Sequence, residues 1–422
     1  MVATTSEAEL IQSDDGVPLK LKLARAERMR KLGAFALVCP MFIFLVVTFI
    51  APIFSLLSLS VQNDVVPDAL PETAALIQHW DGTGLPSPAI FRAFSIELAV
   101  AKKQKIHGKI GKRLNYEISG FRSLIKKTAR RIPPPETSDA DIIDAYIAID
   151  PRWGKSEYWN TIKRSSPQFT AFYLLSAIDK RMDAQGNIVQ APKEVTIYVH
   201  MLWQTVWMSG IVTFLCLLLG FPISFLIATL PTRQSNIMLM LVLLPFWTSL
   251  LVRTTAWVVL LQTEGLVNDL AVLLGFWESD ARVQLIHNRL GVYIAMVHIL
   301  LPFMVLPIFA VMKGIPPSHY RAAVSLGANP VRSFIIVYLP QTIPGIGAGV
   351  LLVFIISLGY YITPALVGGP KDQMLSFFIA LNTNVTVNWG LAAALSVVLL
   401  SIVAVFFAMY NRLVGVDNLK LN

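Results

Sequence analysis

The sequence predicts an all-α polytopic membrane protein with six transmembrane helices and a large, mostly helical external insert between the first two. Two observations carry this prediction. Of the 422 residues, 55% are hydrophobic and only 14% are charged, whereas soluble domains carry about 25% charged residues. The chain also contains six apolar stretches long enough, at about 20 residues, to cross a bilayer as helices. They are residues 33–61, 199–230, 236–262, 291–312, 343–366 and 389–410.

The N-terminal segment, residues 1–32, is predicted to be a cytoplasmic tail that ends in a basic helix. The apolar run that follows, residues 33–61, is longer than the core of a signal peptide, which has about 7–15 residues. We therefore expect it to remain as the first transmembrane helix. Basic residues near a span end favour the cytoplasmic side, so the N-terminus is placed inside. These residues are Lys20, Lys22, Arg25, Arg28, Arg30 and Lys31.

Residues 198–412 are predicted to form a five-helix transmembrane core, followed by a cytoplasmic tail of residues 413–422. With six spans both termini lie on the same side of the membrane. The short loops agree, because Arg233, Lys313 and Arg332 all fall on the inside. The formal charge of +9 is largely explained by this topology and by the insert, so we expect no nucleic-acid partner.

Residues 62–197 are predicted to form a periplasmic insert domain. Its stretch from Lys102 to Arg131 is strongly basic, but long loops cross the membrane largely regardless of charge. Turning the chain over would place every short basic loop on the wrong side. The insert is long enough to fold as a small domain, with helices expected at residues 90–105, 138–149 and 169–181.

The loop of residues 313–341 carries the most specific local signals. Gly327 suits the left-handed position that ends a helix, Asn329 is a good N-cap, and Pro330 suits the first turn of the next helix. Pro340 marks the return of the chain into the membrane. We expect two short helices around one bend. Such a compact element on the inner face is a poor lipid anchor and a good docking element for a soluble partner.

The same loop resembles the EAA motif of binding-protein-dependent ATP-binding-cassette importers: Glu-Ala-Ala, three residues, Gly, nine residues, Ile-x-Leu-Pro. Arg321 stands where the family has Glu, which puts an acidic contact at that position in doubt. The resemblance implies that the loop couples this chain to an ATPase. The residues implied are Tyr320, Arg321, Ala322, Ala323, Gly327, Ala328, Asn329, Pro330, Leu339 and Pro340.

Residues 244–257, 301–303 and 359–370 are similar to permeases of the spermidine/putrescine type, and this resemblance extends over residues 199–415. It implies a multi-pass permease of the bacterial inner membrane that is not an enzyme and binds no cofactor itself. The implied partners are a second permease, in a heterodimer, a periplasmic solute-binding protein, membrane lipid and two ATPase subunits that bind ATP and Mg. ATP binding would draw the coupling loops together and tilt the helices between inward- and outward-facing states.

Six residues of the spans are candidates for the substrate path. Arg253 is an intramembrane charge, which marks a functional candidate, and a structural hydrogen-bonding role is the alternative. The aromatic candidates could stack on substrate, but aromatic residues near span ends also act as interfacial anchors. The candidates are Trp247, Thr248, Arg253, Trp257, Tyr360 and Tyr361.

No catalytic residue and no metal site is predicted. Residues 154–156 (Gly-Lys-Ser) match the end of a phosphate-binding loop, but Ile149 stands where that loop needs a glycine. His200 and His298 lack partners at metal-binding spacing.

Two other functions are alternatives to the importer. A secondary transporter would need intramembrane carboxylates, and the predicted spans contain no Asp or Glu. A membrane sensor would need an inside output domain, for which the C-terminal tail is too short. The solute stays open between a polyamine, an amino-acid derivative and another small polar organic compound.

Overall fold

The computed structural model describes residues 19–134, 136–183, 186–193, 195–276 and 278–414, and the chain divides after Ser58 into two compact units. In the first unit, α1 (Leu19–Leu45), the π-helical turn η2 (Val46–Ile50) and α2 (Ala51–Ser58) follow one another without a break. Residues 25–58 qualify as a candidate membrane span. Apolar side chains such as Phe54, 73% exposed, suit a helix whose solvent is lipid.

Residues 59–197 form a helical region around an aromatic core. Trp153, Trp159, Tyr146, Phe91 and Phe94 are fully buried, and the rings of Tyr146 and Trp153 meet edge to face, 5.7 Å apart at 88°. The indole nitrogens are satisfied, because Trp153 Nε1 donates to the Thr128 hydroxyl at 2.8 Å. Large rings with paired polar atoms bury much apolar surface at little desolvation cost, so this region has a core of its own.

Helix α7 (Phe121–Arg130) shows how the sequence builds this core. Its buried residues follow helical spacing, and its basic residues occupy the opposite, exposed face. The buried residues are Phe121, Leu124, Ile125, Thr128 and Ala129. The other elements of the region are α3 (Val65–Ala69), α4 (Pro71–Gln78), α5 (Pro88–Lys103), α6 (His107–Asn115), α8 (Ile142–Ile149), η3 (Pro151–Gly154), α9 (Ser156–Ser165), α10 (Phe172–Ala177), β1 (Lys180–Met182) and β2 (Ile188–Gln190).

The helices predicted in this region are found with changed ends. Helix α5 covers most of the helix predicted at residues 90–105. The helix predicted at residues 138–149 starts only at Ile142, as α8, because the Ser138 hydroxyl closes a turn with the Asp141 carboxylate at 2.7 Å. The helix predicted at residues 169–181 is wrong in its second half. Helix α10 ends at Ala177, and β1 then pairs antiparallel with β2, with Arg181 opposite Val189.

Asp179 explains why α10 stops. It takes a left-handed conformation, with φ of 56°, and is 4% exposed. Its carboxylate accepts the backbone N–H groups of Ile197, Tyr198 and Val199 at 3.1, 3.0 and 2.9 Å. These groups begin helix α11 (Tyr198–Thr229) and would otherwise lack partners. Asp179 thus caps the second candidate span from within the preceding region.

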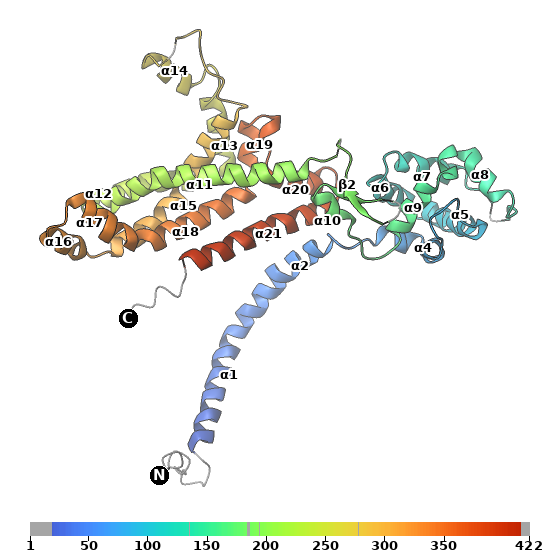
Figure 1. The fold of residues 1–422 in the computed structure, drawn as a ribbon, viewed down its shortest axis with the longest axis horizontal. Helices are drawn as coiled ribbons and strands as arrows, with labels where there is room; N and C mark the ends of the chain where they lie inside the picture. The colour runs from blue at the N-terminus through green and yellow to red at the C-terminus, as the bar shows by residue number, and fades with distance from the viewer. Residues whose placement is uncertain (1–18, 135, 184–185, 194, 277, 415–422) are drawn as a thin grey trace. The chain divides into compact units, whose positions relative to one another are not determined.

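The transmembrane core is a bundle in which α11, α15 (Arg289–Gly314) and α18 (Leu339–Gly359) pack on one another, and α21 (Trp389–Val414) lies beside α18 (Figure 1). Close approach is possible where glycine meets a neighbouring helix. A Cβ on Gly220 or Gly349 would lie only 2.9 or 2.8 Å from the Met304 side chain. Small residues at helix contacts are a usual device in membrane bundles.

Among the described residues, five helices are long and apolar enough to span a membrane, or six if a bent pair counts as one span. That pair replaces the single helix predicted at residues 236–262. Helix α12 (Thr232–Leu243) continues into η4 (Leu244–Trp247), and α13 (Leu250–Leu260) leaves at 97°. The physical reason is local: Thr248 is extended, and the Ser249 hydroxyl accepts the Val252 N–H at 3.2 Å as the N-cap of α13.

The span predicted at residues 343–366 is shifted toward the N-terminus. Helix α17 (Pro330–Ser333) runs through the π-helical turn η5 (Phe334–Tyr338) into α18, so the candidate span covers residues 330–359. Tyr360 is extended, with φ −75° and ψ 130°, and stops the helix. The spans predicted at residues 199–230, 291–312 and 389–410 agree with α11, α15 and α21 within a few residues.

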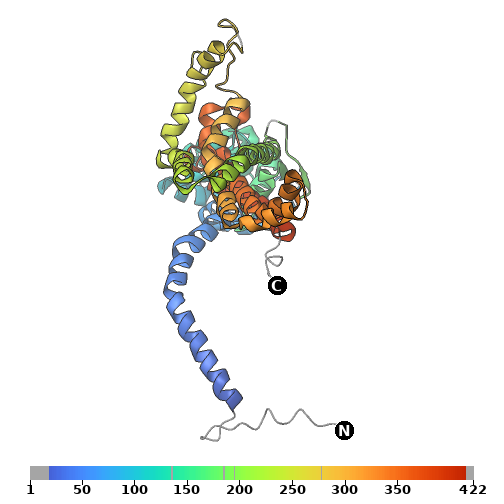
Figure 2. The ribbon, with the colours of Figure 1, turned by 90° about the vertical axis from the view of Figure 1, so that its left-hand side faces the viewer.

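The remaining elements are short connections: α14 (Leu266–Leu273), α16 (Pro317–Ser325), α19 (Ile362–Val367), η6 (Pro370–Asp372) and α20 (Leu375–Asn384). In both views α14 lies beyond the end of α13, away from α18 and α21 (Figure 1 and Figure 2). Residues 1–18 of the predicted N-terminal tail and residues 415–422 of the predicted C-terminal tail lie outside the described residues. The side of the membrane on which residues 62–197 lie stays a prediction.

Candidate functional site

The loop between α15 and α18 contains the predicted bend. After α16, the Gly327 N–H donates to Val324 O at 3.0 Å and the Ala328 N–H to Ala323 O at 3.1 Å. This pair of bonds is the Schellman arrangement, which needs a left-handed residue at the first position after the helix cap. Gly327 supplies it with φ of 90°. The left-handed conformation predicted for Gly327 is therefore present.

The second half of the loop is only partly as predicted. The Asn329 carboxamide oxygen accepts the Val331 N–H at 3.0 Å, and Pro330 is the first residue of α17. The second helix is not short, however, because α17, η5 and α18 form one continuous helix. Leu339 and Pro340 lie in the first turn of α18, directly after η5. The π-helical turn accommodates the missing N–H of Pro340 without ending the helix.

Helix α16 is presented to its surroundings rather than packed into the bundle. None of its residues is buried; Arg321 and Ala322 are exposed, and Tyr320 and Ala323 are half-buried. Close to the bend, Leu326 is 89% exposed and Val331 66% exposed. A small apolar surface next to exposed polar residues is typical of a protein-binding element.

Two contacts hold this element on the bundle. In the first contact, the ring of Phe225 on α11 packs against the rings of Phe334 and Tyr338 in η5. The ring centre of Phe225 lies 5.5 Å from that of Phe334 and 5.6 Å from that of Tyr338, and the Phe334 and Tyr338 centres are 5.4 Å apart. On the other side, His319 Nδ1 and the Gln341 carboxamide oxygen are 2.8 Å apart, which joins α16 to α18. These contacts join η5 to α11 and α16 to α18.

A polar cluster lies at the bent pair, within the membrane-spanning part. Trp257 Nε1 on α13 donates to His298 Nδ1 on α15 at 3.1 Å, and the hydroxyls of Thr254 and Thr363 are 3.2 Å apart. Arg253 lies within electrostatic reach of His298 and of Tyr360. Its Nε is buried and has no hydrogen-bond partner among the described residues.

The structure thus gathers three of the six predicted path residues: Arg253, Trp257 and Tyr360. Trp247 and Thr248 lie in the break itself, where Trp247 is 88% exposed and the Thr248 hydroxyl donates to Pro245 O at 2.8 Å. Tyr361, 38% exposed, begins the turn into α19. The sequence reasoning missed His298, because its partner Trp257 lies 41 residues away in the chain and only helix packing brings the two together.

Within the described part of the chain, no group of three or more His, Cys, Asp or Glu side chains is arranged to hold a metal ion. The two cysteines are unpaired, Cys216 buried and Cys39 partly so. The chemistry that these sites offer is recognition by hydrogen bonds, aromatic faces and one cation.

Comparison with known proteins agrees with this architecture. Residues 199–414, about half of the chain, match the family described as binding-protein-dependent transport system inner membrane component. The spermidine/putrescine transport system permease protein PotB of Haemophilus influenzae is 33% identical over 216 residues, which cover 51% of this chain and 75% of that protein. PotB of Escherichia coli K12 is 32% identical over 225 residues, 53% of this chain and 81% of PotB.

One further protein sequence and one solved structure are also similar to this chain. The Escherichia coli inner membrane ABC transporter permease protein YdcU is 32% identical over 226 residues, 51% of this chain and 72% of YdcU. A crystal structure of a bacterial alginate ABC transporter aligns with a TM-score of 0.42 at 19% identity, covering 52% of this chain and 78% of that one. The matched family and the apolar helices make the chain a multi-pass inner membrane permease, which belongs to the family of binding-protein-dependent transport system inner membrane components.

Proposed function

We propose that this chain is the permease subunit of an ATP-binding-cassette importer for a small polar organic solute. With a second permease it forms the path across the membrane. A periplasmic binding protein delivers the solute, and two partner ATPase subunits bind and hydrolyse ATP with Mg. Both termini of the chain lie in the cytoplasm, and residues 62–197 lie in the periplasm. The solute is polyamine-like or amino-acid-derived, in keeping with the names of the PotB relatives.

The observation that carries this proposal is the bend at Gly327. A helix with no buried residue, α16, is held at a defined angle by two backbone hydrogen bonds and by the cap at Asn329. Its tip exposes the side chains of Leu326 and Val331. A rigid and exposed element at one end of a helix bundle is suited to bind a soluble partner and to move with it.

The contacts beneath this element support a mechanical role. The rings of Phe334 and Tyr338 pack against Phe225 of α11, and α11 and α18 both pack on α15. Packed helices shift as bodies rather than deform smoothly. Movement of α16 toward its counterpart on the second permease would therefore tilt these helices together.

The cluster around Arg253 is the proposed contact with the solute. Arg253 is half-buried, and its Nε is buried without a hydrogen-bond partner among the described residues. Such an atom is costly, so an ordered water or a carboxylate of an amino-acid-derived solute completes it. The Tyr360 and Trp257 rings offer aromatic faces, which suit organic ammonium groups. A structural role for Arg253 is the alternative, and uptake measurements with substitutions at this position separate the two.

Site-directed cross-linking tests the proposed coupling. In a chain with Cys39 replaced by Ser, Leu326→Cys places a thiol at the tip of the bend, where the native side chain is 89% exposed. We expect it to cross-link to the ATPase subunit in membranes that contain the whole transporter. Leu273→Cys on α14, where the leucine is 80% exposed, is the control and should give no such product.

The reverse result, cross-linking through position 273 and none through 326, would reject the proposed coupling surface. The solute itself is identified separately, from the ligand bound to the binding protein that co-purifies with the intact transporter.

A further inference from the structure

A pocket of about 340 Å³ lies where residues 59–197 meet the start of α21. Transport as proposed above does not use it. Its charged lining residues are Asp64 and, on or near α6, Lys109, Lys112 and Arg113. Tyr116 and Trp389 also line it. The pocket is therefore bordered by more basic than acidic groups, and by aromatic rings.

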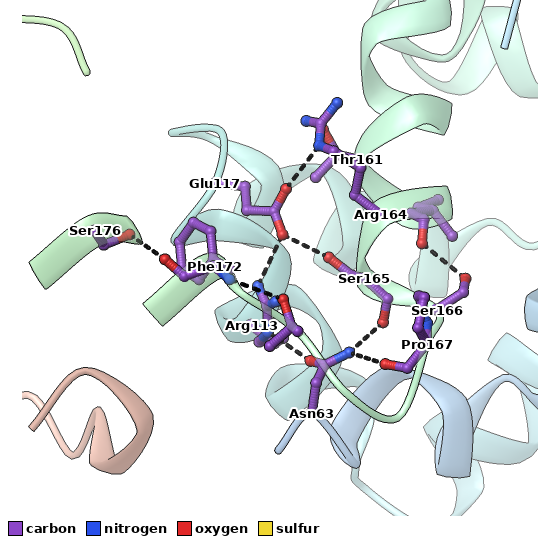
Figure 3. Close-up of polar contacts among 12 residues, drawn as sticks. Asn63, Arg113, Glu117, Thr161, Arg164, Ser165, Ser166, Pro167, Phe172 and Ser176 are labelled. Carbon is purple, nitrogen blue, oxygen red and sulfur yellow. Dashed lines mark hydrogen bonds and ion pairs between the residues drawn. The ribbon is translucent and has the colours of Figure 1, made fainter. Parts of the chain in front are cut away.

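The contacts around Arg113 are shown in Figure 3. This side chain is 2% exposed; its Nε donates to Asn63 Oδ1 at 2.7 Å and its Nη1 to Glu117 Oε1 at 3.1 Å (Figure 3). The guanidinium also lies over the rings of Phe172 and Tyr173, at 4.8 and 5.3 Å from their centres. Glu117 is shared between Arg113 and Arg164, whose Nε lies 3.3 Å from Glu117 Oε2. The charge of Arg113 is therefore only partly balanced, and Lys109 and Lys112 add to it against the single carboxylate of Asp64.

Two polar atoms of the lining residues remain without a partner. Arg113 Nη2 and the Tyr116 hydroxyl are both buried and form no hydrogen bond among the described residues. Burial raises the pKa of Tyr116 to about 12, with a further increase from Tyr173 beside it, so the hydroxyl is a donor at neutral pH. Buried donors nearly always have an acceptor. Two orphan donors on residues that line one pocket indicate an acceptor with several oxygens.

The pocket lies at the ends of membrane spans. Trp389 is the first residue of the candidate span that α21 forms, and Leu59, which also lines the pocket, directly follows the last residue of the first candidate span. Lys112 Nζ donates to Thr386 O at 2.7 Å and to Val387 O at 3.3 Å, in the loop that leads into α21. Tryptophan, tyrosine and lysine are typical of this depth, the headgroup level of a bilayer.

A close contact keeps the two sides of the pocket together. The ring of Tyr173 on α10 covers Gly390, where a Cβ would lie only 2.4 Å from a ring carbon. Any larger residue at position 390 would push α10 away from α21. The pocket is thus part of a defined junction and not an accidental gap between loosely joined parts.

We propose that this pocket binds the phosphate of an anionic phospholipid headgroup at the junction of residues 59–197 with α21. Lys109 and Lys112 supply the attraction, and the Tyr116 hydroxyl and Arg113 Nη2 donate to phosphate oxygens after a small side-chain adjustment. Leu59 and Trp389 face the acyl chains. The inference rests on the proposed permease only in so far as α21 spans the bilayer, and it is independent of solute and ATPase.

The experiment uses the purified full-length chain and native mass spectrometry to compare bound phosphatidylglycerol with phosphatidylcholine, with inorganic phosphate as a competitor. Lys109→Gln removes one exposed positive charge from the pocket and should weaken phosphatidylglycerol binding about fivefold, the effect expected per basic residue near an anionic surface. Tyr116→Phe removes one orphan hydroxyl and should weaken it about tenfold. Lys126→Gln, an exposed lysine of α7 that does not line the pocket, is the charge-matched control and should bind like the wild type.

Three results would overturn the proposal. Equal binding of phosphatidylcholine, which carries the same phosphate but no net charge, would show that a net negative headgroup is not required, and equal loss with Lys126→Gln would indicate a diffuse basic surface. Competition by inorganic phosphate at the affinity of the lipid would assign the site to free phosphate. Because solute uptake is absent from this assay, failure of the proposed transport function would leave the lipid result unchanged, and the two can fail separately.

Discussion

Replacing Gly327 by valine tests whether the angle of α16 couples this chain to its partners. The φ of 90° is a conformation that side chains with a Cβ rarely adopt. An added Cβ would meet no atom within 4 Å, so steric collision contributes nothing. The whole effect comes from backbone strain, which costs about 1–2 kcal/mol for a residue with a Cβ in the left-handed region.

The loop can escape this backbone strain by opening the bend, and opening costs a similar free energy. Opening the bend breaks the two hydrogen bonds to Val324 O and Ala323 O, at about 1 kcal/mol each. Valine therefore brings the bent and open forms to comparable free energies, and a large fraction of molecules lose the angle. The bundle itself is unaffected, because no residue of α16 is buried.

The assay compares solute uptake and solute-stimulated ATP hydrolysis in proteoliposomes that contain the whole transporter. Gly327→Val should lower both by about half or more, the fraction of molecules that lose the angle, while the chain remains in the membrane at its normal amount. Gly327→Asn should be milder, because asparagine tolerates the left-handed region. Gly314→Val is the matched control: this glycine precedes the same loop, also has no atom within 4 Å of an added Cβ, and lacks a positive φ. Normal stimulated ATP hydrolysis in Gly327→Val would refute the reasoning.

Four further outcomes are expected. The purified chain alone should release no phosphate from ATP, because Ile149 replaces the glycine that a phosphate-binding loop requires; hydrolysis in a sample free of partner subunits would contradict this. Replacing residues 62–197 by a short Gly/Ser linker should lower uptake, weaken binding-protein affinity and flatten its salt dependence, whereas unchanged values at low salt would make the region a spacer. Arg253→Met should abolish uptake without changing the amount of protein in the membrane, and normal uptake would leave Arg253 a structural role only. Hydrogen bonds and ion pairs with Arg152, and then with Lys127, hold the pKa of the Asp150 carboxyl well below its usual range. These ion pairs therefore stabilise the fold above about pH 4, and their contribution is lost as the pH falls further. Asp150→Asn should lower the free energy of unfolding by about 1–3 kcal/mol at neutral pH and make hydrogen exchange in α7 and α9 less sensitive to acid.

The spans were predictable because lipid leaves the backbone few choices. Residues 199–230, 291–312 and 389–410 are predominantly apolar and contain no Asp, Glu, Lys or Arg, and a backbone in lipid must satisfy its own hydrogen bonds as a helix. Hydropathy carries no information on whether a span is straight or bent, however. It could not show that residues 232–260 turn by 97°, although the proline and serine that favour the turn, Pro245 and Ser249, are visible in the sequence.

The bend in the loop between α15 and α18 was predictable for another reason. The left-handed Gly327 and the cap at Asn329 are signals that act over three or four residues, so each can be recognised without the rest of the fold. The predicted length of the second helix is wrong because Pro340 does not end the helix. The preceding π-helical turn, which no local residue preference predicts, lets the helix continue to Gly359.

The sequence by itself determined the positions of most apolar spans, the bend at Gly327 and the family, because these depend on composition and on short-range spacing. Tertiary structure alone decided which distant residues meet. Arg113 finds its partner Asn63 fifty positions away, Trp257 finds His298 forty-one away, and Lys112 reaches a carbonyl 274 positions along the chain. Such contacts depend on how whole helices pack, and packing is a property of the assembled surfaces that no local stretch of sequence specifies.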